Sequence, residues 1–262
     1  SYELPYDPSD LNWSSAGKNL YTRNGGSNQQ YLQEKLASLE GGEDCVVLAS
    51  GVAALSGLFF ALLKSGDHVV FSSVTYIAVY RLLNELLKDK FGVETTIVDT
   101  TDIEKVKAAI RPNTKLIHIE TPGNPTLSIS DIEKIAELAH ANSALLSVDN
   151  TFASPFNQRP IELGADFTVE SLTKYINGHG DAMGGAIIGK KEYLDIIRAQ
   201  SQINLGATIS PFNAWLIMRG SVTLPLRMKQ HNENALKVAR YLKTVKGVSF
   251  VAYPGLEDHP NH

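Results

Sequence analysis

The chain has one cysteine, no long hydrophobic run and no excess of basic residues, and each absence excludes a class of protein. Cys45 has no partner in the sequence, so no internal disulfide can form, and a cytoplasmic location is expected. The apolar run VAALSGLFFALL ends at Lys64, short of the roughly 18 residues expected of a membrane span. The first residues, SYELPYDPSD, lack the basic and then apolar layout of a signal peptide.

The charge balance points to small-molecule partners. The 24 basic and 28 acidic side chains leave a formal net charge of -4, without the basic clusters that bind nucleic acid or an acidic membrane surface. With 262 residues, 43% of them hydrophobic, the chain can bury a full core in more than one layer or domain. We therefore expect a globular protein with no nucleic-acid and no membrane partner.

Short β-branched runs alternate with longer segments of helical period along most of the chain. This alternation predicts βαβ units, and hence an α/β fold with a mostly parallel, mixed sheet flanked by helices. After residue 191 the pattern predicts helices and one closing strand. The expected strands are 45–50, 68–72, 95–99, 115–120, 144–150, 166–171, 184–189 and 248–254. The expected helices are 29–40, 51–63, 77–88, 103–110, one opened by a capping box at 130–133, 192–202, 211–219 and 233–246.

Polar residues follow several of these strands, at the edge where an open parallel sheet binds its ligands. Ser50, Gly51 and Val52 follow the first strand and open a helix, where free N–H groups and the helix dipole favour an anion such as phosphate. The other residues at strand ends are Asn124, Asp149, Ser171, Thr173 and Lys174.

A lysine, an aspartate and an anion cradle at one sheet edge are what pyridoxal 5'-phosphate requires. The lysine amine would form the imine with the cofactor aldehyde, and a carboxylate would hold the proton on the ring nitrogen. Lys174 and Asp149 are the candidates for these roles, and Lys174 would also be the base beside the substrate Cα. The simpler interpretation of Asp149 is a turn cap.

The segment SLTKYINGHGDAMGG, residues 171–185, resembles the lysine signature of the Cys/Met-metabolism family of pyridoxal-phosphate enzymes. That family includes cystathionine γ-synthase, cystathionine γ-lyase, methionine γ-lyase and O-acetylhomoserine sulfhydrylase, and the resemblance covers almost the whole chain. It implies the PLP-dependent transferase fold of type I. It also implies that Lys174 bears the cofactor, that Asp149 pairs with the ring nitrogen, and that Asn124 lies near the ring hydroxyl.

The same resemblance assigns the phosphate site and the partner subunit. Gly51 and Val52 match the backbone amides that hold the phosphate, next to Ser50. Tyr76 matches the tyrosine that stacks on the ring and assists the leaving group at Cγ. Dimers, usually paired into tetramers, are implied. The remaining matches are the hydroxyl donors Ser171 and Thr173, and Tyr21 and Arg23, which would reach the phosphate site of a neighbouring subunit.

Some segments differ from the family pattern. Tyr76-Ile77-Ala78-Val79 stands where relatives often have Tyr-Gly-Gly-Thr, and family members continue beyond residue 262 into a smaller domain that holds the arginine for the substrate carboxylate. We therefore expect an N-terminal arm and first helix at 1–45, a cofactor-binding α/β domain at 46–220, and the start of a truncated C-terminal domain at 221–262. No residue here is assigned as the carboxylate-binding arginine, and no metal site is expected.

These observations predict a PLP-dependent enzyme of sulfur amino-acid metabolism that carries out elimination or replacement at Cγ or Cβ. Cystathionine, methionine and O-acylhomoserine are the candidate substrates, and a C–S lyase is favoured. The alternatives are a transferase of the cystathionine γ-synthase or O-acetylhomoserine sulfhydrylase type and a cofactor-binding but inactive module. A nicotinamide-dependent oxidoreductase is disfavoured, because the glycines of GHGDAMGG lead into a strand rather than a helix. We expect His179 to be a hydrogen-bonded structural histidine and Cys45 a small core residue.

Overall fold

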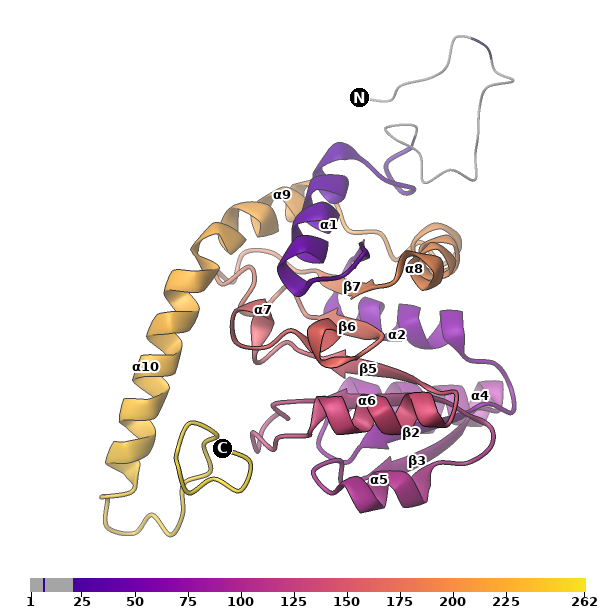
Figure 1. Ribbon diagram of the computed structural model, residues 1–262. Helices are drawn as coiled ribbons and strands as arrows, with labels where there is room; N and C mark the ends of the chain where they lie inside the picture. The colour runs from indigo at the N-terminus through magenta and orange to yellow at the C-terminus, as the bar shows by residue number, and fades with distance from the viewer. Residues whose placement is uncertain (1–6, 8–20) are drawn as a thin grey trace.

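A seven-stranded sheet forms the centre of the computed structural model, which describes residue 7 and residues 21–262 (Figure 1). The strand order is β1-β7-β6-β5-β4-β2-β3. Every strand expected between residues 45 and 189 is present, with ends that shift by no more than two residues. The strands are β1 (Asp44–Leu48), β2 (His68–Ser72), β3 (Glu94–Val98), β4 (Thr114–Glu120), β5 (Leu145–Asp149), β6 (Phe167–Glu170) and β7 (Gly185–Gly189).

The sheet is mixed, as the alternation of elements predicted. The pairs β2–β3, β2–β4, β4–β5 and β5–β6 are parallel, whereas β7 is antiparallel to both β6 and β1. Because β7 reverses direction between them, β1 and β6 point the same way. The carboxyl ends of β1, β2, β4, β5 and β6 therefore meet along one edge of the sheet.

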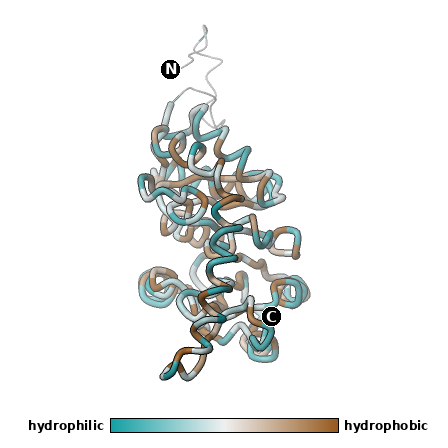
Figure 2. Tube along the Cα trace, turned by 90° about the vertical axis from the view of Figure 1, so that its left-hand side faces the viewer, coloured by the Kyte–Doolittle hydropathy of each residue, from teal (hydrophilic) through white to brown (hydrophobic). Residues whose placement is uncertain are grey.

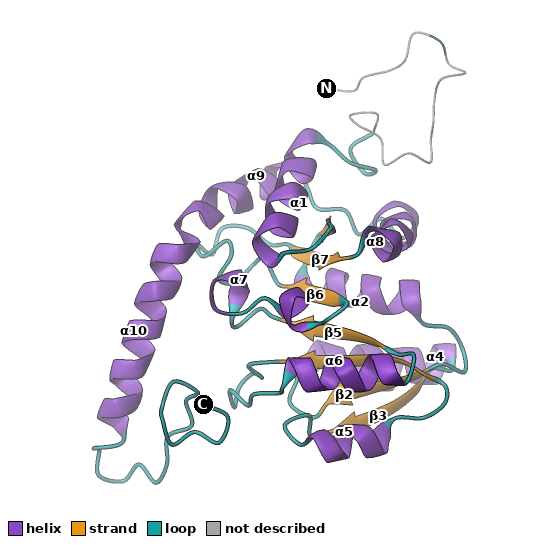
Figure 3. Ribbon diagram, viewed as in Figure 1, coloured by secondary structure: helices purple, strands orange, loops and turns teal. Residues whose placement is uncertain are grey.

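Helices cover both faces of the sheet, as the purple and orange layers of Figure 3 show. Alternate residues of each strand face opposite sides. In β1, Val46 and Leu48 join the core under α2, whereas Cys45 and Val47 join the core under α1. The first face also carries α3 (Ile77–Tyr80), a π-helical segment (Arg81–Leu87), α4 (Lys88–Phe91), α8 (Lys191–Ile197) and a second π-helical segment (Arg198–Asn204), in addition to α2 (Gly51–Leu62).

The opposite face has two hydrophobic clusters. One lies between α1 (Ser27–Glu40), α9 (Pro211–Gly220) and strands β1 and β7. The other lies between α5 (Ile103–Ala109), α6 (Ile132–Ala141) and strands β2, β4 and β5. Shorter elements complete the layer: α7 (Ser154–Asn157) and 3-10 turns at Pro160–Leu163 and Ser221–Thr223. Within residues 21–262 no helix combines the length and the apolar character that crossing a membrane requires.

The long helix α10 (Leu224–Leu242) extends away from the sheet along the left of Figure 1. Hydrophobic and hydrophilic residues alternate along it in the side view of Figure 2. Its predicted start at Glu233 was wrong by nine residues, because Pro225 is compatible with a first helical turn and packing of Leu224 and Met228 continues the helix upstream.

Two further expectations were wrong. Residues 248–254 form no strand: they follow α10 at a distance from the sheet, where no strand edge offers backbone partners, and Phe250 is 80% exposed. The capping box at 130–133 is also replaced by a single cap. The Asp131 side chain accepts from the Lys134 N–H at 3.1 Å, because the Ser130 hydroxyl bonds that of Thr100 at 2.8 Å instead.

The domain division at residues 45 and 220 stays a prediction.

Candidate active site

A cavity of about 620 Å³ opens at the carboxyl edge of the sheet, where the sequence predicted a ligand site. Residues from five strand ends and from α10 meet there. The structure brings together nine of the eleven predicted site residues: Ser50, Gly51, Val52, Tyr76, Asn124, Asp149, Ser171, Thr173 and Lys174.

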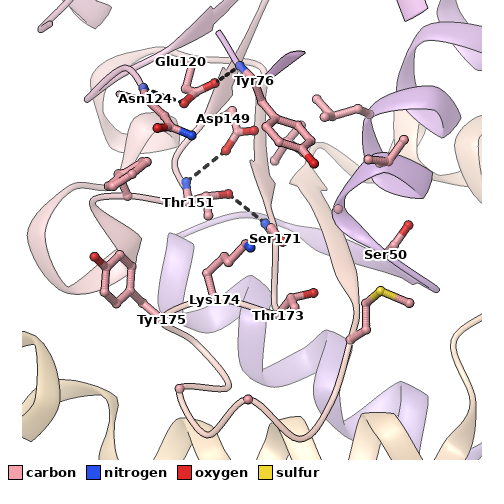
Figure 4. A pocket seen from close by; sticks show the side chains of 18 of the residues that line it. Ser50, Tyr76, Glu120, Asn124, Asp149, Thr151, Ser171, Thr173, Lys174 and Tyr175 are labelled. Carbon is pink, nitrogen blue, oxygen red and sulfur yellow. Dashed lines mark hydrogen bonds between the residues drawn. The ribbon is translucent and has the colours of Figure 1, made fainter. Parts of the chain in front are cut away.

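Lys174 and Asp149 face the same space from neighbouring strand ends. Lys174 lies in the turn after β6, and its amine points into the cavity toward the side where Asp149 and Thr151 lie (Figure 4). Asp149 is 7% exposed, and its Oδ1 accepts the Thr151 N–H at 3.1 Å. The turn-cap interpretation of Asp149 is thus correct as far as it goes, but the same carboxylate also lines the cavity.

Burial raises the pKa of Asp149, and the hydrogen bonds from Thr151 act in the opposite direction. A protonated ring nitrogen beside this carboxylate would also favour its charged form. A buried aspartate at the floor of a cavity that contains a free lysine therefore fits the pyridine end of pyridoxal phosphate.

The start of α2 forms the other end of the cavity. The Ser50 hydroxyl caps the helix by accepting the Ala53 N–H at 3.0 Å, so the N–H groups of Gly51 and Val52 come before the first bonded turn. A Cβ at Gly51 would lie 2.8 Å from the Ser171 Cβ, so only glycine allows this approach. Two leading amides at the start of a 12-residue helix, next to serine hydroxyls, fit a phosphate group.

The segment that carries Lys174 is held by hydrogen bonds on both sides. The Ser171 N–H donates to the Thr151 hydroxyl at 2.8 Å. The Thr173 hydroxyl donates to the Gly184 carbonyl and accepts the Gly184 N–H, each at 3.2 Å. Thr173 is therefore engaged with the backbone here, and its predicted role as a phosphate donor stays a prediction.

Tyr76 and Asn124 enter the cavity from two different loops that one carboxylate joins. The Glu120 Oε2 accepts the Tyr76 N–H at 2.6 Å, and its Oε1 accepts the Asn124 N–H at 2.9 Å. Glu120 is 5% exposed, and burial, followed by the charge of Asp149, raises its pKa to about 7. Sequence reasoning missed this residue, although its position at the end of β4 was a usable indication.

The sequence analysis also did not predict a group of aromatic rings that lines the cavity. Phe152 and Tyr175 contact at 6.3 Å between ring centroids, and Tyr175 contacts His231 of α10 at 5.3 Å. Arg227, one turn earlier on α10, donates to the Tyr175 carbonyl at 2.6 Å. The α10 residues lie more than 50 positions from Lys174 in the sequence, in a helix with no motif of its own, so no sequence pattern pointed to them. Thr151 and Met183 are among the other lining residues that were not predicted.

The structure does not bring Tyr21 and Arg23 to this cavity. Tyr21 is 46% exposed, and the Arg23 guanidinium lies 5.2 Å from its ring centroid and donates to the Ile203 carbonyl at 2.7 Å. Their contact with a neighbouring subunit stays a prediction.

The structural roles expected for His179, a hydrogen-bonded histidine, and for Cys45, a small core residue, are confirmed. The His179 Nδ1 lies 2.6 Å from the Asn177 carbonyl, and Cys45 is fully buried in the core.

An amine, a buried carboxylate and a phosphate-sized helix start around one cavity define a site of the kind that pyridoxal-phosphate enzymes use. The sequence model of "Cys/Met metabolism PLP-dependent enzyme" matches residues 6–262, and the chain belongs to this family. The predicted α/β fold, the predicted pyridoxal-phosphate cofactor and the family resemblance drawn from the sequence are thus confirmed. The roles of individual residues stay predictions.

Several named relatives share this similarity. Canavanine gamma-lyase of Rhizobium leguminosarum bv. trifolii is 56% identical over all 262 residues, which cover 65% of that protein. Cystathionine gamma-synthase of Mycobacterium tuberculosis is 46% identical over 92% of the chain and 62% of its own length. L-methionine gamma-lyase of Treponema denticola is 42% identical over 93% of the chain and 61% of its own length.

Solved structures agree with this relationship. A cystathionine gamma-lyase from Lactobacillus plantarum, complexed with L-serine, superposes with a TM-score of 0.92 at 38% identity and covers all of the chain. The metB protein of Corynebacterium glutamicum gives 0.93 at 42% identity, again over the whole chain. The chain spans 66% of each of these two structures and 61 to 65% of the three relatives above.

Proposed function

We propose that the protein is a pyridoxal-phosphate-dependent γ-lyase that acts on L-amino acids with a leaving group on Cγ. The observation that carries the proposal is that Lys174, Asp149 and the start of α2 line the same cavity. It fits a cofactor with an aldehyde, a ring nitrogen and a phosphate, and it leaves space beside the lysine for an amino acid.

The bound cofactor supplies an electron-accepting ring that stabilises negative charge at the substrate Cα. In the proposed roles, Asp149 holds the proton on the ring nitrogen, and Ser50, Ser171 and the α2 amides hold the phosphate. The Lys174 amine handles two protons in turn: it removes one from Cα, delivers it to the cofactor side of the substrate, and then removes one from Cβ. The electron pair left at Cβ expels the substituent from Cγ. Tyr76, 45% exposed at the cavity mouth, donates a proton to the departing group. Water then releases a 2-oxo acid and ammonia.

The two relatives at 55 and 56% identity are both named canavanine gamma-lyase, which makes canavanine the first substrate to test. Methionine and cystathionine, in which sulfur is bound to Cγ, come next because of the 42 to 46% identical relatives. The cystathionine gamma-synthase among these supports a second candidate, a transferase that replaces the Cγ substituent with a thiol.

We also propose a homodimer, paired into a tetramer, in which Tyr21 and Arg23 of one subunit reach the phosphate site of the next. Both residues lie on an exposed segment outside the cavity of their own chain, which agrees with this role. A cytoplasmic location is proposed from the single cysteine.

A substrate panel on the full-length protein tests the proposal. Canavanine, methionine, cystathionine and O-acylhomoserine are each supplied with and without a thiol, and the 2-oxo acid is measured. Release of 2-oxobutanoate without thiol supports the γ-lyase, whereas consumption that depends on thiol supports the transferase. Pyruvate as the sole 2-oxo acid from cystathionine would contradict cleavage at Cγ. Cofactor absorbance without turnover of any substrate would leave only a binding module.

A further inference from the structure

The buried carboxylate of Glu120 connects the two loops that carry Tyr76 and Asn124. Glu120 is the last residue of β4 and is paired in register with Asp149, the last residue of β5. Its side chain is almost fully buried and lines the cavity beside Asp149. A charged group in this place is costly unless its oxygens are hydrogen-bonded.

Both oxygens are bonded, and each bond leads to a different loop. Oε2 accepts the Tyr76 N–H at 2.6 Å and lies 3.4 Å from the Thr75 hydroxyl, in the loop between β2 and α3. Oε1 accepts the Asn124 N–H at 2.9 Å, in the loop after β4 (Figure 4). Both oxygens therefore act as acceptors, and the 2.6 Å contact is at the short end of the N–H···O distances found in proteins.

The Tyr76 contact also replaces a missing helix cap. Tyr76 occupies the cap position of α3 and makes no capping bond with its own side chain. The helical stretch that follows runs without interruption from residue 77 to residue 91. The Glu120 carboxylate therefore fixes the point where this stretch starts, and with it the position of the Tyr76 ring over the cavity.

We propose that Glu120 is a positioning residue, which holds Tyr76 and Asn124 at the cofactor ring by anchoring their backbone amides to the end of β4. The inference rests on the proposed function, because Tyr76 is taken to act on the leaving group. A displacement of the Tyr76 ring by about 1 Å can lower the rate of the reaction by up to about 100-fold. Glu120 thus acts through the two loops and not by touching the substrate.

Glu120→Gln is the first test, because glutamine has nearly the same shape but only one acceptor oxygen. Its amide N–H₂ must face either the Tyr76 or the Asn124 N–H, so one loop is released. Hydrogen–deuterium exchange of the cofactor-free protein should become at least about 10-fold faster in peptides covering 74–78 or 122–126. Glu85→Gln is the control, since it removes the same charge from an exposed position on the same helical stretch. Unchanged exchange in a folded Glu120→Gln protein would overturn the proposal.

Kinetics provide the second test. Glu120→Gln should lower kcat about 10- to 100-fold with a smaller change in KM. If Glu120 acts through Tyr76, the double variant with Tyr76→Phe should lose about as much kcat as the more damaging single variant. Multiplicative losses would mean that Glu120 acts independently, and they would overturn the proposal.

Glu120→Asp covers the case in which Glu120→Gln does not fold. Aspartate keeps the charge but withdraws the carboxylate by one methylene, so contacts of 2.6 and 2.9 Å cannot both persist. Wild-type exchange and kcat in this variant would count against the proposal. If the wild-type protein neither binds pyridoxal phosphate nor turns over any substrate, the proposed function fails, and the exchange experiment still decides whether Glu120 anchors the loops.

Discussion

Replacing Glu170 by glutamine should stabilise the protein at neutral and alkaline pH. Glu170 at the end of β6 and Glu40 at the end of α1 are both almost fully buried and close enough to share a proton. Asn150 donates to the Glu40 Oε1 at 3.3 Å. Within the described residues, no hydrogen bond of normal distance and angle reaches the Glu40 Oε2 or either Glu170 oxygen, although the Asn150 amide lies close enough to favour the charged form of Glu170. Loss of the shared proton would leave two buried negative charges side by side, which destabilises the folded protein.

The size of the effect follows from the pKa of Glu40, which burial raises from 4.5 to about 7. Hydrogen bonds with Glu170 and Asn150, and then the charge of Arg159, oppose this increase, whereas the charge of Glu162 adds to it. Burial also raises the pKa of Glu170, and Glu40 and then Asp149 raise it further. A raised carboxyl pKa means that stability is fully present below pH 4.5 and is lost as the pH rises to about 7. The loss is about 1 kcal/mol at pH 5 and about 3 kcal/mol at pH 8.5.

In Glu170→Gln, an amide N–H can donate to the Glu40 Oε2 at every pH. The free energy of unfolding should therefore exceed that of the wild type by about 2 kcal/mol more at pH 8.5 than at pH 5, or about 4 to 8 °C in Tm. Thermal and urea unfolding of the cofactor-free protein at both pH values measure this difference. Glu137→Gln, at an exposed position on α6, controls for the change in net charge. A difference that does not vary with pH, or a Glu170→Gln protein that is less stable at pH 8.5, would refute the shared proton.

Three further predictions concern the site itself. Borohydride reduction followed by peptide mapping should find the cofactor on Lys174, and Lys174→Ala should retain none; an unmodified Lys174 in freshly reconstituted protein contradicts the assignment. Gly51→Ala should weaken pyridoxal-phosphate binding at least about 10-fold in a fluorescence titration, because its Cβ would lie 2.8 Å from the Ser171 Cβ; wild-type affinity would argue against the phosphate cradle. Arg23→Ala and Lys174→Ala should each be inactive, yet regain activity after being unfolded together and refolded, because a mixed dimer contains one intact site; no recovery, with mixed dimers present, would rule out a shared site.

The residues at the strand ends could be predicted because each depends on a local pattern. Asp149 and Lys174 follow short buried strands, and the order of strands and helices along the chain indicates a sheet whose carboxyl ends share one edge. The Ser50 cap and the glycine after it are likewise signals within a few residues. Glu120 follows the same rule but was missed, because nothing in its neighbourhood shows that its carboxylate accepts amides from two separate loops.

Patterns that need a distant partner were not predictable. The strand expected at 248–254 has the right composition, but strand formation requires an open sheet edge, and α10 carries this segment away from one. His231 and Arg227 join the cavity only because α10 packs beside the turn that carries Lys174.

The sequence by itself determined the α/β architecture and the cofactor and singled out Lys174 as the predicted attachment point, since hydrophobic periodicity, helix capping and a dense motif are all properties of neighbouring residues. Only the tertiary structure decided which acids face each other. The Glu40–Glu170 pair and the Glu120 anchor each join residues more than 40 positions apart, or amides of separate loops, and the free energy of a buried charge depends on what the fold places around it.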